Sequence, residues 1–249
     1  MFDFNSIFLI SIIFLFAGFV KGASGIGLPA ISLAFLTMFT GIKVAIALVV
    51  MPGLLTNFWQ VFGKFKIKNI IIRMWPLLIC LFIFSLLGAK VLVNNSEILT
   101  LLLGVILTFY ASFSLINKKR IIIPLKYEKV LGACSGALGG FFGGSTGTFI
   151  FPLALYVYSL KMDKNEFLQS IALVLISASF FLGIALTGNK LWTIELFIYS
   201  TYAALPSFIG MYIGRKLQFK LNEDLFRKIF LFVLIVVGFL IINKAVILN

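Results

Sequence analysis

One stretch decides the fold, Phe19-Val-Lys-Gly-Ala-Ser-Gly-Ile-Gly-Leu-Pro29, because its glycines lie in the middle of a long apolar segment. As one straight helix, that segment (Ser6–Phe39) would run about 50 Å, which exceeds a membrane core of about 30 Å. Glycine allows a chain to turn back, at a cost in helix propensity. The stretch therefore predicts a hairpin of two short arms in place of a single straight helix.

The composition indicates that nearly the whole chain lies in a membrane. Of its 249 residues, 61% are hydrophobic and 12% are charged. A soluble domain has about 45–50% apolar and about 25% charged residues. We predict one transmembrane domain over residues 1–249, in contact with a lipid bilayer. Its plain transmembrane helices are predicted at Val44–Phe62, Ile70–Val93, Ile98–Ile116, Phe167–Thr187, Leu191–Ile213 and Phe226–Ile242.

The two halves of the chain resemble each other. The glycine spacing of Gly18–Gly25 recurs in Gly136–Gly143, and Ile46-Ala-Leu-Val49 recurs as Ile171-Ala-Leu-Val174. The second motif has a larger offset, and the extra residues fall in a loop, where insertions are tolerated. The pattern predicts an internal duplication with repeats at residues 1–120 and 128–249. Each repeat is a glycine-rich interrupted segment followed by three plain helices, in an all-α fold.

The basic residues indicate how the repeats are oriented. If both interrupted segments are hairpins, 16 Lys/Arg fall on one face of the membrane, four on the other, and Lys21 stays inside. If both are single passes, the split is 11 to 9, so the positive-inside rule favours hairpins. The repeats are then inverted in topology, and both termini face outward. A cysteine at Asn249 should react with an impermeant thiol reagent on intact cells; labelling only after permeabilisation would contradict this topology.

The two breaks carry the candidate chemistry. We name residues 19–29 the first break and residues 143–147 the second break. An opened turn leaves amide N–H groups free, and helices that begin there direct a positive dipole end at an anion. Lys21 either serves an anion or snorkels to an interface, and the second break either binds or only packs closely. The candidate substrate-binding residues are Lys21, Gly22, Ser24, Gly25, Gly27, Asn57, Gly143, Gly144, Ser145, Thr146 and Gly147.

Several function classes conflict with the sequence. The chain has no histidine, and its eight acids sit at or near the ends of apolar segments, so we predict no enzyme, no metal site and no cofactor. The net charge of +13 comes from short basic clusters between apolar blocks, which is a topology signal. We therefore predict no nucleic-acid partner.

The stretch Ala17–Pro29, its glycine-rich counterpart at Gly136–Pro152, and the all-helical layout of the 249 residues resemble the sulfite exporter TauE/SafE family. The resemblance implies a multi-pass permease of a bacterial-type plasma membrane for sulfur-containing anions. It places Gly22, Gly25, Gly27 and Pro29 in the first motif, and Gly140, Gly143, Gly147 and Pro152 in the second.

These observations favour a transporter for a small anionic substrate. The resemblance implies a sulfur-containing oxyanion or an organosulfonate, moved by alternating access at the paired glycine-rich turns near the midplane. The alternative is a membrane assembly or sensor protein that transports nothing. Anion flux in liposomes distinguishes the two.

Overall fold

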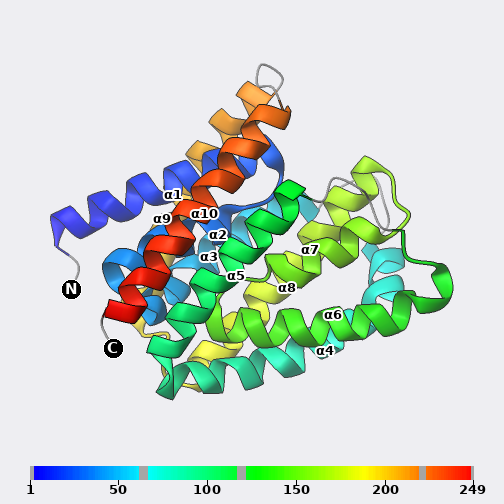
Figure 1. The fold of residues 1–249 in the computed structure, drawn as a ribbon, viewed down its shortest axis with the longest axis horizontal. Helices are drawn as coiled ribbons and strands as arrows, with labels where there is room; N and C mark the ends of the chain where they lie inside the picture. The colour runs from blue at the N-terminus through cyan, green and yellow to red at the C-terminus, as the bar shows by residue number, and fades with distance from the viewer. Residues whose placement is uncertain (1–2, 62–66, 117–121, 219–222, 248–249) are drawn as a thin grey trace. The chain divides into compact units, whose positions relative to one another are not determined.

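The computed structural model describes residues 3–61, 67–116, 122–218 and 223–247, and these residues form ten α-helices without a strand (Figure 1). In chain order the helices are α1 (Phe4–Ser24), α2 (Leu28–Thr40), α3 (Ile42–Val61), α4 (Ile67–Asn94), α5 (Ser96–Ile116), α6 (Leu125–Thr146), α7 (Ile150–Ser159), α8 (Lys164–Gly188), α9 (Ile194–Leu217) and α10 (Glu223–Ile247).

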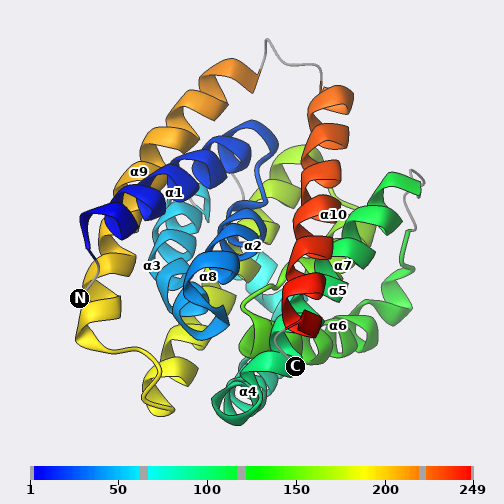
Figure 2. The ribbon, with the colours of Figure 1, turned by 60° about the vertical axis from the view of Figure 1, so that its left-hand side comes forward.

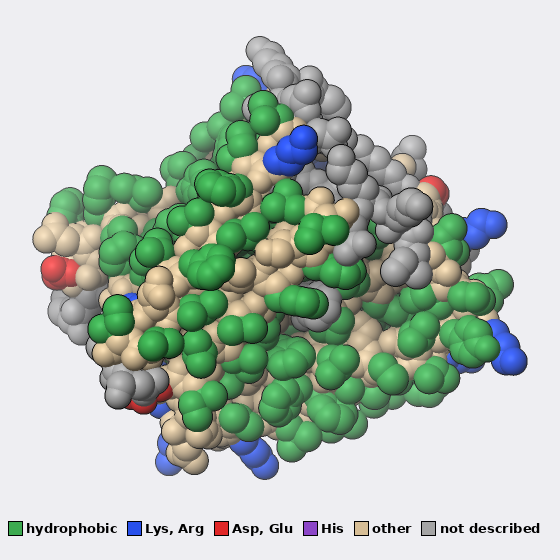
Figure 3. Space-filling view, viewed as in Figure 1, with side chains coloured by type: hydrophobic (Ala, Val, Ile, Leu, Met, Phe, Trp, Pro, Cys, Tyr) green, Lys and Arg blue, Asp and Glu red, His purple; other side chains and the backbone are tan. Residues whose placement is uncertain are grey.

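Seven of these helices are long and apolar enough to cross a membrane: α1, α3, α4, α5, α8, α9 and α10. Each of the six predicted plain transmembrane helices corresponds to one of them. Hydrophobic side chains dominate the face in Figure 3, and large ones such as Phe4 and Tyr212 are exposed. A bilayer accommodates such a surface, so the predicted all-α, multi-pass membrane class is confirmed.

The helix is interrupted in both glycine-rich segments. In the first, α1 ends at Ser24, Gly25 adopts the left-handed conformation with φ 83°, and α2 begins at Leu28. In the second, α6 ends at Thr146 and Gly147 has φ 75°. Only glycine adopts such a positive φ at little cost, which explains why each helix stops where it does.

We expected two short arms on the two sides of each break, but the structure has one long arm and one short arm. The first arms, α1 and α6, have 21 and 22 residues, which corresponds to about 32 Å of helix. Only the second arms are short, with 13 residues in α2 and 10 in α7. The expectation was wrong for α1 and α6 because their glycines pack between helices and do not end the helix.

The second arm runs back along the first in each segment. In the second segment, an added Cβ at Gly143 would meet Phe149, one at Gly139 would meet Leu153, and one at Gly132 would meet Tyr156. In the first segment, the rings of Phe16 and Phe35 lie 6.4 Å apart. Residues further before the turn contact residues further after it, as in an antiparallel pair of helices (Figures 1 and 2).

The chain forms two compact units. Unit 1 contains residues 1–52, 95–118 and 192–249, and therefore α1, α2, α5, α9, α10 and the first part of α3. Unit 2 contains residues 53–94 and 119–191, and therefore α4, α6, α7, α8 and the rest of α3. Each unit holds one of the two breaks.

Glycines bring helix backbones together inside each unit. In unit 1, an added Cβ at Gly18 would lie 2.9 Å from the Cα of Ser207, which joins α1 to α9. In unit 2, an added Cβ at Gly136 would lie 2.9 Å from the Cα of Leu77, which joins α6 to α4. Small residues allow such close contact between membrane helices.

Candidate functional site

The first break leaves the beginning of α2 without a capping side chain. The N–H of Gly25 donates to the carbonyl of Lys21 at 2.7 Å, which closes the end of α1. Gly27 is the N-cap of α2 and makes no side-chain cap, and Pro29 occupies the first turn. Pro29 has no N–H to satisfy, and the remaining amides of that turn point out of the helix end. The amides at this end of α2 are therefore the candidate donors for an anion.

Glycine is required at position 27 for both conformation and space. Gly27 has φ 109°, which side chains rarely adopt, and an added Cβ would lie 3.3 Å from the ring of Phe230 and 3.5 Å from Val20. The residue is buried, as are Leu28, Pro29 and Ala30 that follow it. The start of α2 is therefore enclosed by protein, while the turn before it reaches the surface at Ser24.

Lys21 lies in the last turn of α1 and is 1% exposed. A snorkelling lysine keeps its ammonium at a surface, whereas this side chain is enclosed by protein. This burial argues against the snorkelling interpretation. A buried lysine in a membrane segment marks a functional position by default.

The hydroxyl groups of the breaks already donate to backbone carbonyls. Ser24 Oγ donates to Ile26 O at 2.6 Å and also lies 2.8 Å from Val20 O. Ser145 Oγ donates to Phe141 O at 2.8 Å, and Thr146 Oγ1 donates to Phe142 O at 2.7 Å. A hydroxyl has one proton to donate, so these groups must rotate before they can serve an anion. The backbone amides at the start of α2 are therefore the candidate donors that need no such rotation.

The second break resembles the first in how its helices end and begin: a left-handed glycine closes the first helix, and the second helix begins without a side-chain cap. Gly147 closes α6 by donating to Gly143 O at 2.8 Å, and Phe149 begins α7 without a side-chain cap. Gly143 itself lies inside α6 against the Phe149 ring, and Gly144 lies against the backbone of Ser85 in α4. Gly143 and Gly144 therefore serve packing. The helix cap equivalent to Gly25 is Gly147, and not Gly143 as the glycine spacing suggested.

Two further candidates, Gly22 and Asn57, lie within helices and not in the turn of either break. Gly22 lies in α1, where an added Cβ would meet the backbone of Met211 at 2.8 Å. Asn57 lies in α3, is fully buried, and its Nδ2 donates to Gly53 O at 2.7 Å. Gly22 therefore has a packing role. Asn57 belongs to unit 2, whereas the first break belongs to unit 1.

A lysine compensates the opposite end of α2. Lys244 Nζ, near the end of α10, donates to Met38 O in the last turn of α2 at 2.6 Å. A cation at a helix C-terminus interacts favourably with the helix dipole. The short helix α2 therefore has a resident charge partner at its C-terminal end and no side-chain cap at its N-terminal end.

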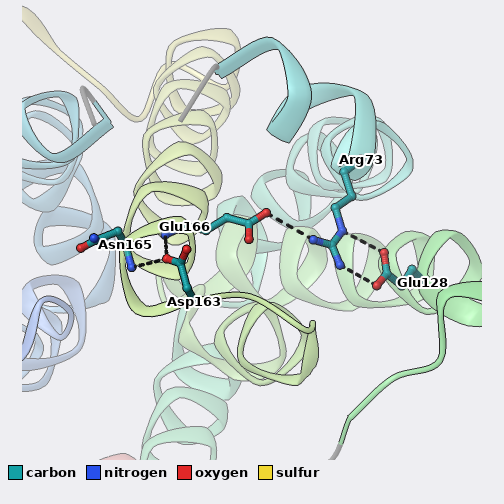
Figure 4. A network of polar contacts seen from close by, with 5 residues as sticks. All are labelled: Arg73, Glu128, Asp163, Asn165 and Glu166. Carbon is teal, nitrogen blue, oxygen red and sulfur yellow. Dashed lines mark hydrogen bonds and ion pairs between the residues drawn. The ribbon is translucent and has the colours of Figure 1, made fainter. Parts of the chain in front are cut away.

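Unit 2 contains an ion network that the sequence analysis did not predict (Figure 4). Arg73 in α4 binds Glu128 of α6 with two hydrogen bonds, Nε to Oε2 at 2.9 Å and Nη2 to Oε1 at 2.7 Å. Its Nη1 lies 3.4 Å from Glu166 Oε1 in α8. Tyr156 Oη donates to Glu128 O at 2.9 Å, and Glu128 is buried. The sequence placed Glu128 at a segment end, and nothing in its pattern predicted an arginine 55 positions away.

The fold and the first break together define a polytopic membrane transport protein. Interrupted helices that present uncapped N-terminal ends are typical of secondary transporters. A family model described as Sulfite exporter TauE/SafE matches residues 10–241. The chain therefore belongs to the sulfite exporter TauE/SafE family, whose members are membrane transporters of sulfur-containing anions. Comparison with curated proteins gave no match, and comparison with solved structures gave none.

Proposed function

We propose that the protein carries a sulfur-containing oxyanion or an organosulfonate across a bacterial-type plasma membrane by alternating access. The observation that carries the proposal is the uncapped, buried N-terminal end of α2, which follows the buried Lys21 closely in the chain. Backbone amides and a lysine replace part of the hydration shell that an anion loses when it enters the protein. A family transporter of sulfur anions needs such a group of donors.

The charge balance of the first break favours an anion over a cation. The amide end of α2 carries the positive part of the helix dipole. Lys21, when protonated, adds a positive charge in the preceding helix, and no acidic residue occurs among residues 4–96. A cation at this position would be repelled by both features. Sulfite, thiosulfate and sulfonates share the tetrahedral or pyramidal oxygen arrangement that several convergent N–H donors can bind.

Alternating access requires two related halves, and the helix contacts support the predicted duplication. Gly18 and Gly136 are equivalent at an offset of 118, and they contact Ser207 and Leu77, which are equivalent at an offset of 130. The interior prolines of the contacted helices, Pro76 in α4 and Pro206 in α9, share that offset of 130. In both units the first helix of one repeat thus packs on the same plain helix of the other.

The transport proposal is tested by flux in proteoliposomes. Vesicles containing the purified protein are challenged with sulfite, thiosulfate, sulfoacetate, sulfate and, as a cation control, rubidium. We expect flux of at least one sulfur anion that depends on the protein and saturates with concentration. Rubidium flux without anion flux would overturn the proposal. No flux of any solute would favour an assembly or sensor protein.

The same assay tests the part played by Lys21. Removing a charged hydrogen-bond donor costs about 1.5–3 kcal/mol, so Lys21→Met should raise the half-saturating anion concentration about 10- to 100-fold. Lys90→Met is the matched control, because Lys90 is exposed on α4, which belongs to unit 2. Equal anion affinity in Lys21→Met and wild type would show that Lys21 is a structural residue.

A further inference from the structure

Helix α3 contains a weak point at Pro52 and Gly53. Proline inside a helix has no N–H, so it cannot donate to the carbonyl four residues earlier, which is that of Leu48. Its ring also crowds that carbonyl, and the glycine that follows lowers the local helix propensity further. Prolines and glycines of this kind are the common sites of helix kinks.

A serine from another helix fills the hydrogen-bonding gap. Ser200 of α9 is fully buried, and its Oγ donates to Leu48 O at 3.0 Å. The same oxygen accepts the N–H of Met51 at 3.0 Å. The Ser200 hydroxyl therefore donates to Leu48 O, to which Pro52 cannot donate, and accepts from Met51 N–H in the adjoining turn. The arrangement is specific, because the donor lies 152 positions away in the sequence.

The same point in α3 is where the chain changes compact unit. Unit 1 ends at Pro52 and unit 2 begins at Gly53, while the other changes fall at 94/95, 118/119 and 191/192, between helices. Among the ten helices described, only α3 contributes to both units. Within unit 2, an added Cβ at Gly53 would lie 2.8 Å from Ser179 Oγ in α8, so α3 continues in close contact there.

We propose that Pro52–Gly53 is a hinge in α3 used during transport, and that Ser200 is the positioning residue that supports the α3 backbone at this point. A hinge needs a place where bending breaks few hydrogen bonds, and Pro52 removes one from the start. It also needs a group that keeps the exposed backbone atoms satisfied, since buried unpaired N–H and C=O groups are unfavourable. Ser200 meets the second need. The kinetic part of this proposal rests on the transport function proposed above.

The first arm of the test is the pair Pro52→Ala and Pro76→Ala. Alanine at position 52 restores the N–H for Leu48 O and stiffens α3. We expect the maximal anion flux to fall about tenfold with unchanged half-saturating concentration, and amide hydrogen exchange in residues 49–57 to slow. Pro76→Ala is the control, because Pro76 lies inside α4, which belongs to one unit only. It should leave exchange in α3 unchanged.

The second arm is a double-mutant cycle on thermal stability and exchange. Ser200→Ala removes the side-chain donor to Leu48 O, so it should lower the melting temperature and accelerate exchange in residues 49–57. In the Pro52→Ala background the same change should have little effect, because the introduced alanine then supplies the N–H donor for Leu48 O. Ser207→Ala is the control: Ser207 is also fully buried on α9, but it donates to Ala203 O of its own helix.

The outcomes separate the hinge from the transport proposal. Wild-type flux and unchanged exchange in Pro52→Ala would overturn the hinge. Additive effects of Pro52→Ala and Ser200→Ala would overturn the role of Ser200. If the wild-type protein transports no anion, the transport proposal fails, while slower exchange in Pro52→Ala together with a coupled cycle would still support a break in the α3 hydrogen bonding that Ser200 compensates.

Discussion

Gly18→Ala is expected to lower the melting temperature of the detergent-solubilised protein by roughly 5–10 °C. The added methyl group would lie 2.9 Å from both the Cα and the carbonyl carbon of Ser207, and backbone atoms cannot rotate away as a side chain can. The helices α1 and α9 would have to separate along their whole contact. Overpacking of this kind costs about 1–3 kcal/mol, and contact with backbone places it at the upper end.

The repeat equivalent gives an independent test of the same effect. Gly136→Ala would bring a methyl group 2.9 Å from the Cα of Leu77, so it should destabilise unit 2 to a similar extent. Gly188→Ala is the matched control, because nothing lies within 4 Å of the position that its Cβ would take. Equal melting temperatures for Gly18→Ala and Gly188→Ala would contradict the close contact between α1 and α9.

Glu128→Gln is the second change with a large expected effect. It removes the charge that Arg73 binds through two hydrogen bonds, and breaking one partner of a buried ion pair costs about 3–5 kcal/mol. Arg73 is partly exposed and keeps Glu166 as a second partner, so we expect the lower end of this range. Thermal unfolding should occur about 5–10 °C lower than in the wild type.

Two further variants show whether this loss comes from the ion pair. Glu97→Gln, an exposed acid in the first turn of α5, should leave the melting temperature unchanged. Removing both charges with Arg73→Met and Glu128→Leu should restore much of the stability, since apolar replacements of buried ion pairs are often close to neutral. A double variant as unstable as Glu128→Gln would show that packing around Glu128, and not its charge, is the cause.

Much of the fold could be predicted because it depends on properties that are local in the sequence. The lengths of the apolar blocks determine the six plain helices, and Gly25 and Gly147 provide the positive φ at which α1 and α6 end. The lengths of the arms could not be predicted in this way. A glycine that ends a helix and a glycine that packs inside one, such as Gly22, look alike until the neighbouring helix is known.

The candidate site was predicted less completely, because it depends on partners distant in the sequence. Lys21 and Gly27 could be named as candidates from their local pattern, and their role stays a prediction. The orientation of Ser145 could not be, since a hydroxyl near a turn bonds either a ligand or its own helix. The burial of Glu128 and the position of Ser200 against the backbone of α3 depend on residues 55 and 152 positions away. No local pattern contains that information.

The contact between Lys244 and Met38 makes α2 an electrically asymmetric element. Lys244 offsets the negative partial charge at the C-terminal end of α2. The positive partial charge at the N-terminal end then has no equal negative charge at the other end of the helix. An anion bound at the start of α2, as proposed above, would interact with something closer to a fixed half charge than to a short dipole, and the attraction would fall off more slowly with distance. We expect the protein without substrate to keep this unbalanced positive charge at the start of α2. Binding of an anionic substrate would then neutralise it.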